Sequence, residues 1–470
     1  MSTGNAHNAC EEFNRAQLLR NAAASAGNGL PAIEAGMPAP AGTGLSRRQF
    51  LLRSGAFSLT IYGAMHLNAL GLGEAIANAA AGPPQPILVS VFLDGGADSL
   101  SILAPVEDPI YRKLRPTLAL PVDSGTAFAD DTRMRWNLAA DSFRVLHEEN
   151  KLAVAPSVGY DHPDQSHFTS RHYWEVGALD TRLQTGWLGR YLDVVGSPDN
   201  PLQGLSLDYS LAPSLAPVKA PVAAISQPNS YRFEHQNVWG ELGDTMVTSL
   251  GDLGYSNLKS KDSAVKKAAA ASTQSMKLRE QLLPFAVDED QQPSGIRPPA
   301  GVVYPTDGGE FPERMQALAA MIGIGLPLKC VAVRGTGGYD THDAQEQDFA
   351  TNIKMTADTL LAFQRDLEAR GLQDRVLVEV WSEFGRRPEE NGSAGTDHGA
   401  AGTAILIGSR VKRQLLGEWT GLAQLDEDEN LRASLDYRAL HGAILDQWFG
   451  FDAAQIIPGV RSFAIPALLT

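Results

Sequence analysis

Five short, mostly apolar runs constrain the fold of this 470-residue chain more than any other feature of its sequence. They occupy residues 87–93, 152–158, 330–334, 376–381 and 403–407. Runs of this length with many β-branched residues are typical of buried strands, and the helical patterns between several of them are typical of crossover connections. The sequence therefore predicts an α/β fold around a mostly parallel central sheet.

The clearest helical pattern covers residues 342–369, where apolar side chains such as Phe349 and Ile353 recur on one face. A second pattern, at residues 311–324, precedes the third strand-like run. A stretch rich in Lys, Ala and Ser at residues 259–281 is typical of an exposed helix. These helices are expected to cover the sheet or to extend from it.

The N-terminal region carries the pattern of a twin-arginine export signal. Residues 46–52 read Ser-Arg-Arg-Gln-Phe-Leu-Leu, and a moderately apolar stretch and a run of small residues follow. The alternative is a permanent membrane anchor, but Arg53 and Glu74 bracket only about twenty residues, several of them glycine. We therefore predict that residues 1–81 are a leader and signal peptide.

Residues 82–470 are expected to form a single domain with a helical insertion at about 240–300. The exported protein would be periplasmic or secreted, without a membrane span, after contact with the twin-arginine translocase. The full chain has a formal net charge of −15 at pH 7, which argues against nucleic acid as a partner. Cys330 would be the one cysteine left after processing, so no intramolecular disulfide is expected.

Polar residues follow four of the runs, at the strand ends where open α/β sheets bind ligands. After the first run, Asp94 and Asp98 flank glycines and suit a hard cation, or Asp98 caps a turn. After the second run, Ser166 and His167 lie in a segment with three histidines. Ser166 at a helix start is either a nucleophile or a simple N-cap, and both interpretations are open.

The third cluster contains Asp340 and His342, whose oxygen and nitrogen atoms suit a divalent metal, although Asp340 is alternatively an N-cap. In the fourth cluster Arg386 suits an anionic substrate, because guanidinium matches phosphate and sulfate geometry. A structural salt bridge to Glu379, Glu389 or Glu390 is the alternative for Arg386 or its neighbour Arg387. Glu383 and His398 would meet if the loop between them folds back.

Several segments resemble the DUF1501 family, in the family's order and with similar spacing. These are residues 92–100, 111–121, 166–168, 339–342, 383–386, 395–399, 435–438 and 448–450. Members of this family usually carry twin-arginine signals and resemble the alkaline phosphatase and sulfatase superfamily. The resemblance implies an alkaline-phosphatase-like three-layer sandwich, in which helices cover both faces of the sheet and a metal site lies at the strand ends.

The resemblance also implies roles for individual residues. Metal ligands are expected among Asp94, Asp98, Asp340, His342, Glu383, Asp397 and His398, and catalytic groups among Ser166, His167 and Arg386. The ion would be zinc, calcium, magnesium or manganese. The implied activity is hydrolysis of small or polymeric phosphate or sulfate esters by Ser166 or a metal-bound water.

Two departures from the superfamily limit this expectation. The strand end that usually shows an adjacent Asp-His pair carries Glu383-Phe384 here, which weakens the case for a two-metal site. No C-x-P-x-R sequence exists, which excludes a sulfatase that works through formylglycine. The sequence thus leaves two hypotheses: a metal-dependent hydrolase, and a non-catalytic exported envelope or binding protein that retains the fold.

Overall fold

The computed structural model describes residues 59–62, 85–198, 200–225, 240–282 and 297–470. Ten strands form the central sheet in the order β1-β8-β7-β9-β2-β10-β13-β6-β14, and β15 also pairs with β6. Their bounds are β1 Leu59–Tyr62, β2 Ile87–Phe92, β6 Leu152–Gly159, β7 Gly204–Leu207, β8 Val222–Ile225, β9 Cys330–Arg334, β10 Val376–Trp381, β13 Gly402–Ile407, β14 Gln414–Leu415 and β15 Leu435–Asp436.

The strands of this sheet run in one direction except β13 and β1. Strand β13 is antiparallel to both β10 and β6, and β1 is antiparallel to β8. The predicted mostly parallel sheet is confirmed, but the run at residues 403–407 does not belong to its parallel part. The chain returns from β10 to the adjacent β13 through a loop without a crossover helix, and such a connection produces an antiparallel pair.

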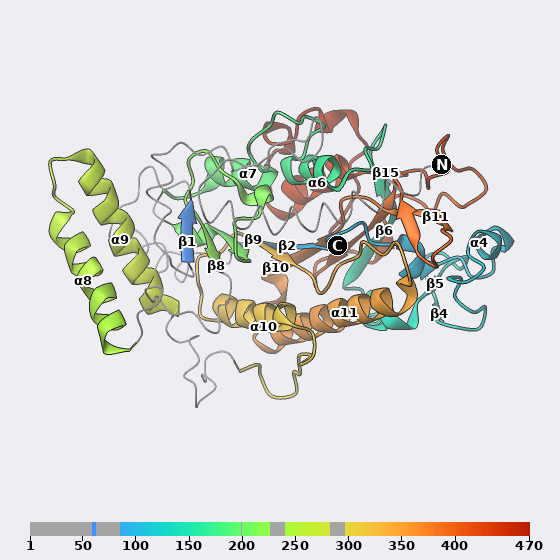
Figure 1. Ribbon diagram of the computed structural model, residues 1–470, viewed down its shortest axis with the longest axis horizontal. Coiled ribbons are helices and arrows are strands. Elements are labelled where there is room, and N and C mark those ends of the chain that lie inside the picture. The colour runs from blue at the N-terminus through green and yellow to red at the C-terminus, as the bar shows by residue number, and fades with distance from the viewer. Residues whose placement is uncertain (1–58, 63–84, 199, 226–239, 283–296) are drawn as a thin grey trace.

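Helices cover both faces of the sheet (Figure 1), so the predicted three-layer sandwich is confirmed. Side chains of β2 alternate between the faces: Val89 and Val91 pack with helices α5, α10 and α11, and Leu88 packs with α6, α7 and α12. The helix bounds are α4 Pro109–Leu114, α5 Asp141–Glu148, α6 His167–Val176, α7 Trp187–Val195, α10 Glu310–Gly323, α11 Gln345–Ala369 and α12 Tyr437–Ala443, which continues as a π-helix through Trp448.

Two small sheets lie beside the central one. Strands β11 (Arg386–Glu390) and β12 (Thr396–His398) form an antiparallel ribbon in which Arg386 is the register partner of His398. The other small sheet contains β3 (Leu103–Ala104), β4 (Thr126–Ala127) and β5 (Arg135–Trp136). The ribbon matters for function because it leaves the end of β10 and returns His398 to the same edge of the sheet.

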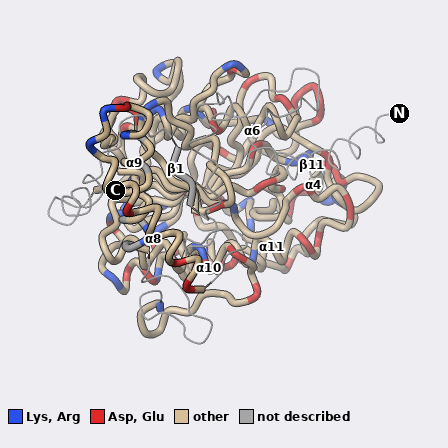
Figure 2. The backbone as a smooth tube through the Cα atoms, turned by 60° about the vertical axis from the view of Figure 1, so that its left-hand side comes forward, with Lys and Arg blue, Asp and Glu red and all other residues tan. Residues whose placement is uncertain are grey.

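A helical hairpin occupies the region where we expected an insertion. Helices α8 (Glu241–Asn257) and α9 (Ser263–Leu282) lie side by side at one end of the molecule (Figure 1). Strand β1 falls within the predicted leader, and the rest of residues 1–81 lies outside the described residues. In the view of Figure 2, basic and acidic positions are intermixed along the described backbone. No helix in the described ranges has the length and apolar character needed to cross a membrane.

We expect the fold to lose stability in mild acid because two histidines are buried away from the strand-end cluster. Burial lowers the pKa of His147 and His172, so both are neutral in the folded state at neutral pH. Below an unfolded pKa of about 6.5 the unfolded chain binds more protons, and stability falls by up to about 1.4 kcal/mol per pH unit for each group. Urea unfolding at pH 7.5 and 5.5 measures this loss of stability. The difference in unfolding free energy between the two pH values should be smaller in the His147→Gln and His172→Gln variants.

Candidate metal centre

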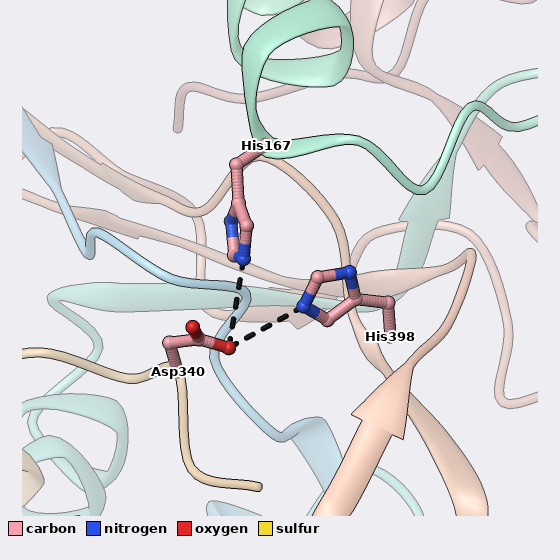
Figure 3. A group of neighbouring side chains, drawn as sticks. All are labelled: His167, Asp340 and His398. Atoms are coloured by element: carbon pink, nitrogen blue, oxygen red, sulfur yellow. Dashed lines mark hydrogen bonds and ion pairs between the residues drawn. The ribbon is translucent and has the colours of Figure 1, made fainter. Parts of the chain in front are cut away.

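Asp340 is the hub of the polar cluster at the carboxyl edge of the sheet. Its Oδ1 atom lies 3.5 Å from Nε2 of His167, 3.1 Å from Nε2 of His342 and 3.3 Å from Nε2 of His398. Figure 3 shows His167 and His398 pointing at this oxygen from two sides. His167, Asp340 and His398 each offer one ligand atom, and these three atoms lie within 4.8 Å of one another.

Three different segments deliver these four side chains. Asp340 and His342 lie in the loop between β9 and α11, His167 is the first residue of α6, and His398 ends β12. The long helix starts at Gln345, later than predicted, and its N-cap is Ala344, which has φ +42° and makes no side-chain cap. Asp340 therefore does not cap the helix and is available as a ligand.

The Nδ1 atom of each histidine contacts an acceptor oxygen, while its Nε2 atom faces Asp340. Nδ1 of His167 lies 2.8 Å from Glu383 Oε1, and Nδ1 of His342 lies 3.3 Å from Asp397 Oδ1. Nδ1 of His398 lies 2.8 Å from the backbone oxygen of Gln165. These acceptors favour the tautomer with the proton on Nδ1, in which Nε2 carries the lone pair that can bind a metal.

The spacing of the converging atoms is compatible with ligands of one ion, and the set whose atoms all lie within 4.8 Å of one another is His167, Asp340 and His398. Ligand bonds of 2.0–2.2 Å to zinc imply separations of about 3.4 Å between neighbouring ligand atoms. The separations from Asp340 Oδ1 to the three Nε2 atoms are 3.1–3.5 Å, and Nε2 of His342 lies 3.0 Å from Nε2 of His398. Two Nε2 atoms that face each other this closely share at most one proton, so they either form a hydrogen bond or face a common cation.

Charge compensation keeps the two central carboxylates ionised. Burial acts to raise the pKa of Asp340, but hydrogen bonds with His167, His342 and His398 and the charge of Arg386 hold that pKa well below its usual range. Burial likewise opposes ionisation of Glu383, and His167 more than offsets it, so the pKa of Glu383 is also lowered. Both groups thus act as hydrogen-bond acceptors at neutral pH.

Glu383, predicted as a metal ligand, supports the site from behind. Its carboxylate accepts hydrogen bonds from the backbone N–H groups of Gly95 and Gly96 at 3.0–3.2 Å and contacts His167. The next residue, Phe384, places its ring 4.8 Å from the rings of both His167 and His398. Phe384 therefore packs an aromatic ring against two imidazoles of the cluster. Asp397 also lies behind the site, at Nδ1 of His342.

Arg386, predicted to bind a substrate anion, is fully buried and serves the protein itself. It donates to the backbone oxygens of Gly96 and Thr396 at 2.8 and 2.7 Å and to Asp340 Oδ1 at 2.6 Å. It also contacts the backbone oxygens of Gly95 and Tyr339. All N–H donors of Arg386 are engaged by groups of the protein, so none remains for a substrate anion. Arg386 therefore forms a structural salt bridge, and its acidic partner is Asp340.

Two further predicted residues have structural roles. Asp98 is the N-cap of a short 3-10 turn and forms a buried ion pair with Arg115 at 2.5 and 2.9 Å. Ser166 is the N-cap of α6, and its Oγ accepts a hydrogen bond from the backbone N–H of Phe168 at 3.2 Å. In both cases the capping alternative left open by the sequence describes the observed geometry.

Asp94 lies beside the cluster at the end of β2 and pairs with arginines. Its Oδ2 lies 3.1 Å from Arg334, and its Oδ1 lies 3.9 Å from Arg171. Arg171 stands one helical turn after His167 and stacks over the ring of Phe92. Sequence reasoning missed Arg171 and the backbone oxygen of Gln165. The helical spacing from His167 was the available signal for Arg171, but no pattern identifies a single backbone oxygen.

The structure defines an α/β protein with a candidate His–Asp metal centre at the carboxyl edge of its sheet. The chain belongs to the DUF1501 family, described as a protein family of unknown function, whose model matches residues 175–462. This range includes Asp340, His342 and His398. None of the curated proteins compared with the chain matches it.

Two solved structures show distant similarity to the chain. One is Ps i-CgsB in complex with k-i-k-neocarrahexaose, with 8% identity, a TM-score of 0.29, and coverage of 80% of this chain and 75% of that chain. The other is the PsFucS1 sulfatase from Pseudoalteromonas sp., with 11% identity, a TM-score of 0.29, and coverage of 85% and 74%. Because the sequence identities and TM-scores are this low, neither structure supports a conclusion about the site. The fold is assigned from the observed strand order.

Proposed function

We propose that this protein is a metal-dependent hydrolase of phosphate or sulfate esters, small or polymeric. The convergence of histidine Nε2 atoms on Asp340 Oδ1 carries the proposal, since each imidazole is also fixed through Nδ1. His167, Asp340 and His398 would hold the ion, and His342 lies beside them in contact with Asp340 and His398. Imidazole-rich sites favour zinc over calcium and magnesium, which prefer oxygen ligands.

A divalent ion bound here would polarise an ester oxygen and lower the pKa of a bound water. The chain's own part is to position that chemistry: Glu383 and Gln165 orient His167 and His398, and Arg386 fixes Asp340. We assign the attack to water in preference to Ser166, because the Ser166 hydroxyl caps α6. The proposal also keeps export through the twin-arginine route, which is supported by the pattern at residues 46–52.

One observation favours a second candidate, a non-catalytic exported protein. Arg386 lies 2.6 Å from Asp340 Oδ1 and compensates the charge of that carboxylate without a metal. In this case the cluster is a buried polar network that holds the loops at the sheet edge together. The two candidates differ in whether the protein requires a divalent ion.

Metal analysis of the purified full-length chain separates them. We expect about one divalent ion per chain, a lower melting temperature in chelator, and hydrolysis of at least one ester in a panel of phosphate monoesters, phosphate diesters and sulfate esters. His398→Ala should lose the ion and the activity. The matched control is His162→Ala, an exposed histidine outside the cluster, which should change neither.

A metal-free protein whose melting is unchanged in chelator would contradict the hydrolase and leave the second candidate. A protein that binds the ion through His398 but turns over no ester in the panel would keep the metal centre and remove the proposed substrates.

A further inference from the structure

Helix α8 has two rows of apolar or small residues, and only one row is covered. The buried row contains Gly243, Val247, Gly251 and Gly254. The exposed row contains the residues immediately before them: Leu242, Met246, Leu250 and Leu253, which are 64%, 39%, 39% and 62% exposed. Single exposed apolar residues are ordinary, but four at helical spacing on one helix indicate a surface that packs against something.

Helix α9 covers only the first row. A Cβ at Gly251 would lie 2.8 Å from Met276, and Ser272 Oγ donates to the backbone oxygen of Leu250 at 2.8 Å, so the two helices are in close contact. Consecutive residues of a helix differ in direction by about 100°, so the exposed row faces roughly at a right angle to α9. This is the geometry of a helix in a four-helix bundle, where each helix packs against two neighbours.

The charges of the hairpin indicate which helix packs against the exposed row. Helix α8 contains three acidic residues, Glu241, Asp244 and Asp252, and no basic residue. Helix α9 contains four basic residues and one acidic residue. A second hairpin that places its α9 against this α8 brings opposite charges together, whereas an anionic membrane surface would be repelled by α8.

We propose that the α8–α9 hairpin is a homodimer surface, in which two copies of the chain form a four-helix bundle with α8 of each copy against α9 of the other. The first turns of α9 expose Ala264, Val265 and Ala268, which are small enough to accept the leucine row of α8. The same patch serves on both copies, as a two-fold symmetric dimer requires. The inference stands apart from the metal centre, because its residues are on the hairpin.

Sedimentation analysis of the full-length chain tests this proposal. We expect a dimer, and we expect the Leu242→Glu/Leu253→Glu variant to weaken it at least tenfold while the far-UV circular dichroism spectrum of the full-length protein stays unchanged. Leu242→Ala/Leu253→Ala is a milder variant that should weaken the dimer less. Val303→Glu, at a residue 81% exposed outside the hairpin, is the matched control and should leave the dimer intact.

Charge reversal tests the orientation of the helices. Glu241→Lys/Asp252→Lys should weaken the dimer, and adding Lys261→Glu/Lys266→Glu should restore it. A wild-type monomer at tens of micromolar, or a dimer indifferent to both sets of variants, overturns the proposal. If the full-length protein binds anionic lipid vesicles and Leu242→Glu/Leu253→Glu abolishes that binding, the exposed row of α8 is a membrane surface. That result also overturns the dimer proposal.

Discussion

Replacement of Asp340 by Asn is expected to abolish the proposed metal binding and to destabilise the metal-free protein by about 3 kcal/mol. The change keeps the shape of the side chain but removes the negative charge that pairs with Arg386 at 2.6 Å, and the Arg386 side chain is fully buried. The variant therefore leaves a buried guanidinium without a carboxylate, in addition to losing a metal ligand. Elemental analysis measures the first effect, and urea unfolding in chelator measures the second.

Asp397→Asn is the matched control for this variant. Asp397 also contacts a cluster histidine, His342, but its side chain is 41% exposed and asparagine can still accept the hydrogen bond. We expect the control to lose less than about 1 kcal/mol of stability and to retain its ion. If Asp340→Asn is as stable as the control in chelator, Asp340 does not organise the cluster in the way its contacts indicate.

The sequence predicted the sheet well because the strands are buried on both faces. Such strands are continuous apolar runs, and β9 and β10 have the predicted bounds. The direction of β13 could not be predicted, because an apolar run carries no information about the direction of its neighbours. Strands β7 and β8 were missed because each is only four residues long.

The sequence identified the chain segments that surround the site, but it was less successful in assigning a role to each residue in them. All four strand-end clusters supply residues to the site or its surroundings, since parallel strands bring their carboxyl ends to one edge. The sequence could not decide which carboxylate faces the centre, because that depends on loop conformation. Asp340 does face it, whereas Asp98 pairs with Arg115, a residue far from the cluster motifs that no spacing connects to it.

The second large effect is expected at a buried pair in the core, Glu379 and His441. Glu379 lies on β10 with both carboxylate oxygens lacking a hydrogen bond among the described residues, and Oε1 is 3.4 Å from Nε2 of His441. The ring of His441 stacks on Trp187 at 4.3 Å. Because the imidazole of His441 is the polar side chain that faces the buried carboxylate of Glu379, His441→Phe should destabilise the fold by about 3–5 kcal/mol.

The reverse truncation should cost much less, because Glu379→Leu removes the carboxylate that is expensive to bury and leaves the imidazole of His441 between aromatic rings. Combining the two changes should bring stability back to within about 1 kcal/mol of the unaltered protein, which requires a favourable coupling energy in the double-mutant cycle. Urea unfolding of the four proteins at pH 7.5 measures that coupling. Equal and additive losses in the two single variants would show instead that shape alone, and not the carboxylate, decides the energetics beneath α12.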